Sequence, residues 1–170
     1  MFWIETVAPA DAVGDLAAVY ARIADARGGV AAIHQAQSLN PRALAAHFDL
    51  YKAILFQTSS LSRAHREAIG VIVSRANACE YCVAHHQAAL DRLPPGPPLH
   101  PRVAEWVERL ARQPESASPS AVEALRGAGL DDRAILDAVL TVSYFSFVNR
   151  VVLALGVPLE TGYEATCRPD

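Results

Sequence analysis

Residues 67–86 read EAIGVIVSRANACEYCVAHH, and this stretch decides how the chain folds. The apolar residues of its first half recur at helical spacing, which predicts a helix that ends at Asn77-Ala78. A second helix is predicted to begin at Cys79. An antiparallel turn between the two helices can return Glu67 to the cysteine that opens the second one.

Helical spacing extends through nearly all of the chain, and no convincing alternating strand pattern interrupts it. Four prolines within residues 94–98 exclude a helix there and predict a surface connection. Predicted helix caps carry a side-chain oxygen that can accept from the first turn: Asp11, Asn40, Ser60 or Ser62, and Asp131 or Asp132. We therefore predict an all-α bundle of about seven or eight helices, in a single domain that spans residues 1–170.

Charge and composition exclude several classes of protein. Of the 170 residues, 15 are Lys or Arg and 18 are Asp or Glu, so the net charge of −3 offers no basic field for a nucleic acid. The N-terminus has no basic region before an apolar run, unlike a signal peptide. The longest uncharged apolar stretch, residues 138–148, is too short to cross a bilayer. We expect a soluble cytoplasmic protein that binds neither nucleic acid nor membrane.

The chemistry of the chain is expected at a Cys-x-x-Cys motif. Cys79 and Cys82 lie three residues apart, and His86 follows four residues later, so all three face one side of a helix. A position in the first turn of a helix lowers the pKa of a thiol, because the helix dipole favours negative charge there. An imidazole can accept the thiol proton, and a carboxylate such as Glu67 can orient the imidazole.

A zinc site is the competing interpretation of this motif, and it needs a fourth ligand. No second Cys-x-x-Cys or His-x-x-x-His pattern exists. One of three residues would have to supply that ligand: His85, Glu67 or Cys167. Haem attachment is excluded in its usual form because Val83, not histidine, follows Cys82. A thioredoxin fold is disfavoured because the cysteines lie between helices rather than after a strand.

Other conspicuous residues receive structural interpretations. Four histidines without partners at ligand spacing are predicted to be surface or partly buried residues: His34, His47, His65 and His100. Three aromatic residues are assigned to the core or to subunit contacts: Trp106, Phe145 and Phe147. Tyr81 lies inside the cysteine motif, where its ring either packs in the core or its phenol donates a hydrogen bond near the thiols. Cys167 is predicted to lie inert in a mobile C-terminal tail.

The spacing of Glu67, Cys79, Cys82 and His86 resembles that of the AhpD-like alkylhydroperoxidases, in particular their peroxidase-related branch, within the carboxymuconolactone decarboxylase superfamily. The resemblance implies a helical fold that assembles into trimers or hexamers, and a peroxidase that needs no bound cofactor or metal. It implies that Cys82 attacks a hydroperoxide, that Cys79 resolves the sulfenic acid, and that His86 with Glu67 relays the proton. It also implies a dithiol or lipoyl-type reductant.

One departure from that family pattern is Tyr81, which stands where characterised members carry a histidine before the second cysteine.

Two other functions compete with peroxide reduction. The first is decarboxylation of a muconolactone-type ring, a branch that does not depend on a cysteine pair. The second is a non-enzymatic helical protein that binds zinc or a partner. Because the chain offers more apolar helical faces than one small core hides, we expect a homo-oligomer: a dimer, trimer or hexamer.

Overall fold

A computed structural model describes residues 1–167 of the chain. Within that range it contains eight α-helices, three short 3-10 helices and no β-strand. The α-helices are α1 (Gly14–Arg27), α2 (Ala32–Gln35), α3 (Pro41–Leu55), α4 (Arg63–Ala76), α5 (Glu80–Asp91), α6 (Pro101–Arg112), α7 (Pro119–Gly127) and α8 (Asp132–Leu155). The 3-10 helices are η1 (Pro9–Asp11), η2 (Pro114–Ser116) and η3 (Tyr163–Thr166). The predicted all-α class is confirmed.

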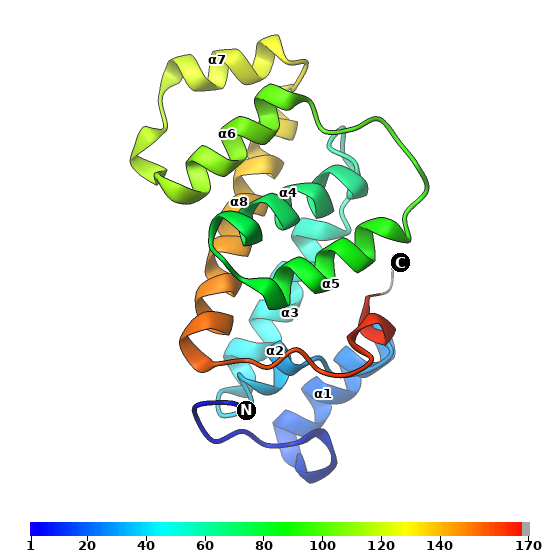
Figure 1. The fold of residues 1–170 in the computed structure, drawn as a ribbon. Helices are drawn as coiled ribbons and strands as arrows, with labels where there is room; N and C mark the ends of the chain where they lie inside the picture. Colours follow the sequence, from blue (N-terminus) through cyan, green and yellow to red (C-terminus); the bar gives the residue numbers. More distant parts are fainter. Residues whose placement is uncertain (168–170) are drawn as a thin grey trace.

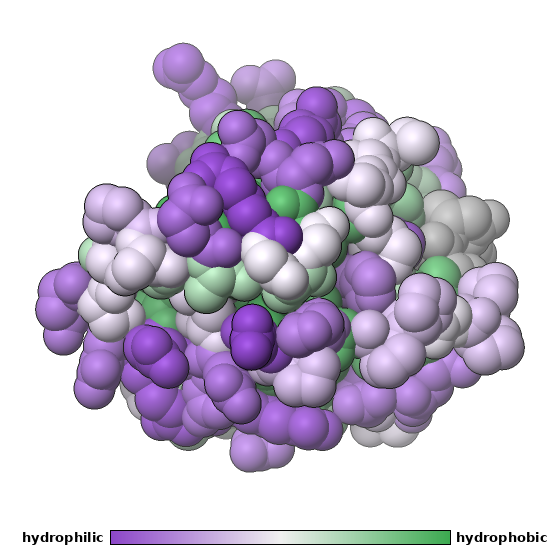
Figure 2. Space-filling model, turned by 90° about the horizontal axis from the view of Figure 1, so that it is seen from above, coloured by the Kyte–Doolittle hydropathy of each residue, from purple (hydrophilic) through white to green (hydrophobic). Residues whose placement is uncertain are grey.

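Helix α4 lies at the centre of the bundle and packs against α5, α6 and α8. Helix α3 packs against α1 and α8, and the buried apolar residues form one continuous cluster. In Figure 1, α6 and α7 lie at one end of the molecule and α1 and α2 at the other. The face over the α6 and α7 end is mostly hydrophilic (Figure 2).

Three of the four predicted helix caps are present. Asn40, Ser62 and Asp131 each accept a hydrogen bond from a backbone N–H in the first turn of α3, α4 and α8. The prediction for Asp11 is wrong, because Asp11 ends η1 and α1 begins at Gly14 without a side-chain cap. The connection at residues 94–98 contains no helix, as predicted.

Helix α8 extends well beyond its uncharged stretch at residues 138–148. By length and composition alone it is the one helix among residues 1–167 that could cross a membrane, and 44% of its most apolar window is buried inside the protein. Its buried face also carries Asp137, Thr141 and Asn149, which all bond to protein partners. These contacts identify α8 as a core helix.

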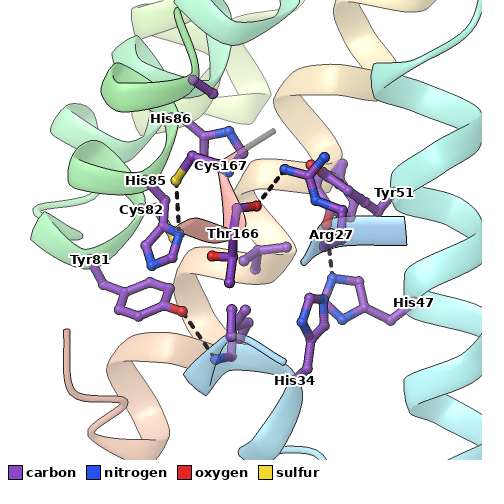
Figure 3. A pocket seen from close by; sticks show the side chains of 15 residues that line it. Arg27, His34, His47, Tyr51, Tyr81, Cys82, His85, His86, Thr166 and Cys167 are labelled. Carbon is purple, nitrogen blue, oxygen red and sulfur yellow. Dashed lines mark hydrogen bonds between the residues drawn. The ribbon is translucent and has the colours of Figure 1, made fainter. Parts of the chain in front are cut away.

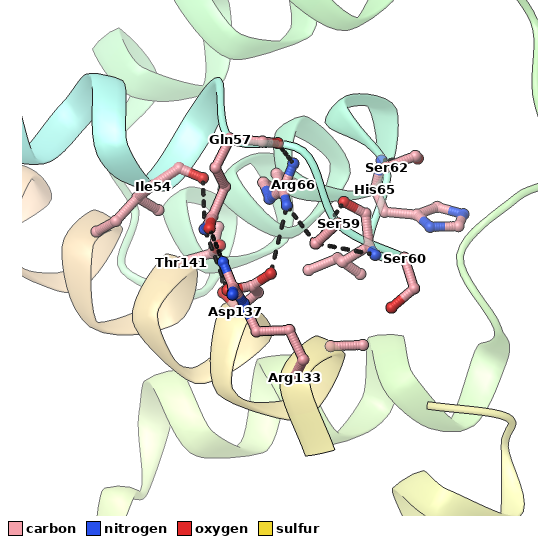
Figure 4. A network of polar contacts seen from close by, with 12 residues as sticks. Ile54, Gln57, Ser59, Ser60, Ser62, His65, Arg66, Arg133, Asp137 and Thr141 are labelled. Atoms are coloured by element: carbon pink, nitrogen blue, oxygen red, sulfur yellow. Dashed lines mark hydrogen bonds and ion pairs between the residues drawn. The ribbon is translucent and has the colours of Figure 1, made fainter. Parts of the chain in front are cut away.

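A buried ion pair joins α4 to α8 (Figure 4). The Arg66 guanidinium lies 3.4 Å from the Asp137 carboxylate, and both side chains are buried. Gln57 and Arg133 donate to the other carboxylate oxygen of Asp137 at 3.1 and 3.0 Å. Separating α4 from α8 would leave a buried charge without its partner, which is unfavourable. The network therefore holds α4, which carries Glu67, in a fixed position against α8.

Candidate active site

The turn between α4 and α5 positions the two cysteines. Ala78 adopts a left-handed conformation, with φ of 55°, and the Cys79 N–H donates to the Ser74 carbonyl at 2.8 Å. Cys79 is therefore the N-cap residue of α5, and Cys82 lies in its first turn. The predicted break and helix start are confirmed. Both cysteines are buried free thiols.

The two thiols share a hydrogen bond. This bond with Cys82 lowers the pKa of the Cys79 thiol, although burial opposes the change. The same bond and burial raise the pKa of Cys82 well above its usual range. The two thiols therefore titrate as one coupled pair, which shares a proton after its first ionisation.

Asn149 on α8 also acts on the thiol pair, and it was not among the residues predicted for the site. Its side chain is fully buried, and its amide oxygen accepts from Asn77 at 3.0 Å. Its amide nitrogen donates to Ser74 at 3.1 Å. The Asn149 side chain also lowers the pKa of both thiols. The oxygen bond fixes the orientation of the amide, so that its N–H groups favour a thiolate. No local motif marks Asn149, because its partners lie on the turn after α4.

Glu67 lies on α4 with a fully buried side chain and bonds two partners. One carboxylate oxygen accepts from Arg63, and the other lies 2.6 Å from His86 Nδ1. Burial alone would raise the pKa of Glu67, but His86 and Arg63 outweigh burial and lower it. The carboxylate is therefore buried between Arg63, one turn earlier on α4, and His86 on α5.

One cavity is lined by both His86, the imidazole that Glu67 holds, and one of the two thiols (Figure 3). Cys82 and His86 of α5 line one side of the cavity, and His34 and His47 line the opposite side. Cys79 is not among its lining residues. Within residues 1–167, no direct hydrogen bond joins His86 to either cysteine, so a proton would cross between them through a molecule bound in the cavity.

His34 and His47 correct the sequence analysis, because both are buried in the cavity wall. Burial lowers the pKa of His34 to about 3 and that of His47 to about 4. Both imidazoles are therefore neutral at neutral pH. The two other histidines agree with the prediction: His65 is partly buried, and exposed His100 caps α6.

The C-terminal segment also differs from the prediction. Cys167 is buried, its Sγ lies 3.6 Å from His85 Nδ1, and it forms part of the cavity wall. Burial raises the pKa of the Cys167 thiol to about 11, so it remains protonated at neutral pH. Arg27 donates to the Thr166 carbonyl at 2.8 Å and so ties this segment to α1.

Tyr81 and the proposed zinc ligands also have defined places. The Tyr81 hydroxyl accepts from the Ile33 N–H at 3.2 Å and donates to Glu160 at 3.4 Å, so it bonds away from the thiols. The His85 ring packs against the Tyr81 ring at a tilt of 31°, with centroids 4.4 Å apart. Across residues 1–167, no three histidine, cysteine or acidic side chains are grouped so that they could hold a metal ion.

Comparisons with known proteins agree on the fold. Residues 41–92 match the model of the carboxymuconolactone decarboxylase family. The fold is similar to that of an uncharacterized peroxidase-related protein from Ralstonia eutropha, which has an alkylhydroperoxidase AhpD core. The TM-score is 0.82 and the sequence identity 21%, and the match covers 98% of this chain and 96% of that one. A peroxidase-related protein from a Silicibacter species has a TM-score of 0.81 and 25% identity, with coverage of 98% and 100%. No protein of curated function matches the sequence.

Proposed function

We propose that this chain, an AhpD-like member of the carboxymuconolactone decarboxylase superfamily, reduces hydroperoxides with Cys79 and Cys82. One observation carries the proposal. His86, which is hydrogen-bonded to the buried carboxylate of Glu67, lines the same cavity as the Cys82 thiol. This arrangement supplies a nucleophile, a resolving thiol, a base and a group that orients the base.

His86 is the proposed base. The Glu67 carboxylate only accepts hydrogen bonds, so its 2.6 Å contact places the imidazole hydrogen on Nδ1. The neutral ring then keeps a lone pair on Nε2, which can accept a proton. Because His86 lines the cavity, a water or the hydroperoxide bound there can carry the proton from the thiol pair to Nε2.

Access to the cavity selects Cys82 as the attacking thiol, since Cys79 does not line it. The shared proton moves from Cys82 to Cys79, and the Cys82 thiolate attacks the terminal oxygen of the hydroperoxide. Sulfur supplies two electrons, the O–O bond breaks, and the products are the Cys82 sulfenic acid and the alcohol. The Cys79 sulfur then attacks the Cys82 sulfur, its proton leaves with the sulfenic hydroxyl as water, and a disulfide remains.

The disulfide requires an external reductant, and we propose a small dithiol or a lipoyl-bearing partner in the cytoplasm. Two thiols of that partner would reduce the bond by thiol exchange and leave as a disulfide. A homo-oligomer is also proposed. Leu136, Leu140 and Phe147 on α8 are large apolar residues that remain exposed in the single chain, and they offer a contact face for a second copy.

Cysteine variants test the assignment of roles. Cys82→Ser should abolish oxidation by tert-butyl hydroperoxide. Cys79→Ser should still permit one oxidation, which a sulfenic acid probe detects by mass spectrometry. If Cys82→Ser is oxidised at the wild-type rate, the assignment of the attacking thiol is wrong.

Replacement of His86 tests the proposed base. His86→Ala should slow the oxidation about 10²-fold or more at neutral pH, since general bases contribute about 10²–10⁴-fold. The deficit should shrink as pH rises towards the pKa of a free thiol, because hydroxide then removes the proton. His100→Ala, which changes an exposed histidine, is the matched control. A His86→Ala deficit that stays constant up to alkaline pH would assign His86 a structural role instead.

A further inference from the structure

A buried chain of hydrogen bonds ends at Tyr144, on the cavity wall. The Gln37 amide nitrogen lies 3.0 Å from the Ile33 carbonyl oxygen and 2.8 Å from His47 Nδ1. The other ring nitrogen of His47, Nε2, lies 2.8 Å from the Tyr144 hydroxyl. The proposed mechanism uses none of these residues.

The direction of each bond follows from the Ile33 carbonyl, which can only accept. It places the amide nitrogen of Gln37, not the oxygen, at this position, and the second amide hydrogen then points at His47 Nδ1. Because burial lowers the pKa of His47 to about 4, the ring is neutral and carries its hydrogen on Nε2. His47 therefore donates to the Tyr144 hydroxyl oxygen.

This assignment leaves the hydroxyl hydrogen of Tyr144 without an acceptor among residues 1–167. The Tyr144 side chain is buried, and a buried polar hydrogen is rarely left unbonded. Burial also raises the pKa of Tyr144 well above its usual range, so the phenol keeps the hydrogen. Tyr144 lines the same cavity as Cys82 and His86, and an acceptor bound in that cavity would satisfy it.

We propose that Tyr144 is a further catalytic residue, whose hydroxyl donates a hydrogen bond to the oxygen that leaves the hydroperoxide when Cys82 attacks. This inference rests on the proposed function and deepens it. The Cys82 sulfur bonds to the terminal oxygen, which keeps its hydrogen as the sulfenic acid. The inner oxygen departs with the electron pair of the O–O bond, and the Tyr144 hydrogen bond stabilises its negative charge. The proton lost by the thiol then returns to that oxygen, which leaves as the alcohol.

The nature of the leaving oxygen decides how much a donor such as Tyr144 contributes. Side chains of Ile33, Ala89 and Val148 give the cavity apolar walls, which suit the carbon part of an alkyl hydroperoxide. An alkoxide is a poor leaving group, so a donor at the leaving oxygen matters most for this class. A peroxy acid, by contrast, releases a carboxylate, which needs little stabilisation.

The two classes of oxidant give a test that a purely structural role of Tyr144 would not pass. Tyr144→Phe should lower the rate of Cys82 oxidation by tert-butyl hydroperoxide about 10²–10³-fold, the usual effect of one lost donor to a developing oxyanion. Its rate with peracetic acid should fall by less than about threefold. Tyr20→Phe is the matched control, because Tyr20 is a buried tyrosine whose hydroxyl donates to the Val7 carbonyl at 2.9 Å. It should leave both rates unchanged.

A second variant tests the same hydrogen bond without removing Tyr144. Gln37→Glu replaces the amide donor with a carboxylate that only accepts, so His47 should carry its hydrogen on Nδ1 and accept from Tyr144. At about pH 8 this variant should show the same selective loss with tert-butyl hydroperoxide. Equal losses with both oxidants, or no loss in either variant, would overturn the role of Tyr144 alone. If neither tert-butyl hydroperoxide nor peracetic acid oxidises Cys82 in the wild-type chain, the proposed function is wrong as well.

Discussion

Acid should destabilise this protein through His34 and His47, and the size of the effect follows from their burial. Their pKa values fall from 6.5 to about 3 and about 4 in the folded chain. Below pH 6.5 the unfolded chain therefore binds protons that the folded chain excludes, so stability falls as pH falls. Below pH 6.5, each histidine lowers the free energy of unfolding by about 1.4 kcal/mol per pH unit. Between about pH 7 and pH 5, the loss is therefore about 2 kcal/mol for each histidine.

Urea unfolding at these two pH values measures the loss directly. We expect the wild-type free energy of unfolding to fall by about 4 kcal/mol, and that of His47→Gln by about 2 kcal/mol, because one of the two titrating groups is gone. His100→Asn, which keeps a capping side chain on an exposed position, should show the wild-type loss. If His47→Gln still loses the full amount, His47 is not held neutral by burial and the bond directions assigned to it are wrong.

Three other results are expected. Gly70→Ala should destabilise the fold by about 1–3 kcal/mol in thermal unfolding, because an added Cβ would overlap the Phe145 ring; an unchanged Tm would contradict this packing. Asn149→Ala should slow alkylation of the reduced thiol pair by iodoacetamide about tenfold or more, since a hydrogen bond to a charged group contributes about 1.5–3 kcal/mol; a wild-type rate would remove Asn149 from the site. Light scattering should give a multiple of the 18.2 kDa chain mass at micromolar concentration, and a monomer would refute the proposed homo-oligomer.

Local chemistry explains which features were predictable from the sequence. A cap such as Asn40 or Ser62 acts on the helix that directly follows it, so neighbouring residues contain the whole signal. The Cys79–Cys82 spacing is likewise local, and Glu67 and His86 lie on the two helices joined by one short turn.

Contacts between distant segments explain what was missed. His47 bonds Tyr144, 97 residues away, and Cys167 contacts His85, 82 residues away. Neither His47 nor Cys167 belongs to a motif. His47 is buried because α3 packs on α8, and Cys167 is buried because the C-terminal segment packs on α5. The sequence pattern around a histidine in a helix is the same whether its face of the helix is covered by another segment or exposed. The cavity itself is therefore a property of the tertiary structure.

A thiol titration tests the central claim most directly. The reduced protein contains three free thiols, Cys79, Cys82 and Cys167. After one equivalent of tert-butyl hydroperoxide, titration under denaturing conditions should find one thiol, and peptide mapping should find Cys79 joined to Cys82 with Cys167 free. Three remaining thiols, or a main product that contains a Cys167 disulfide, would contradict peroxide reduction by this cysteine pair.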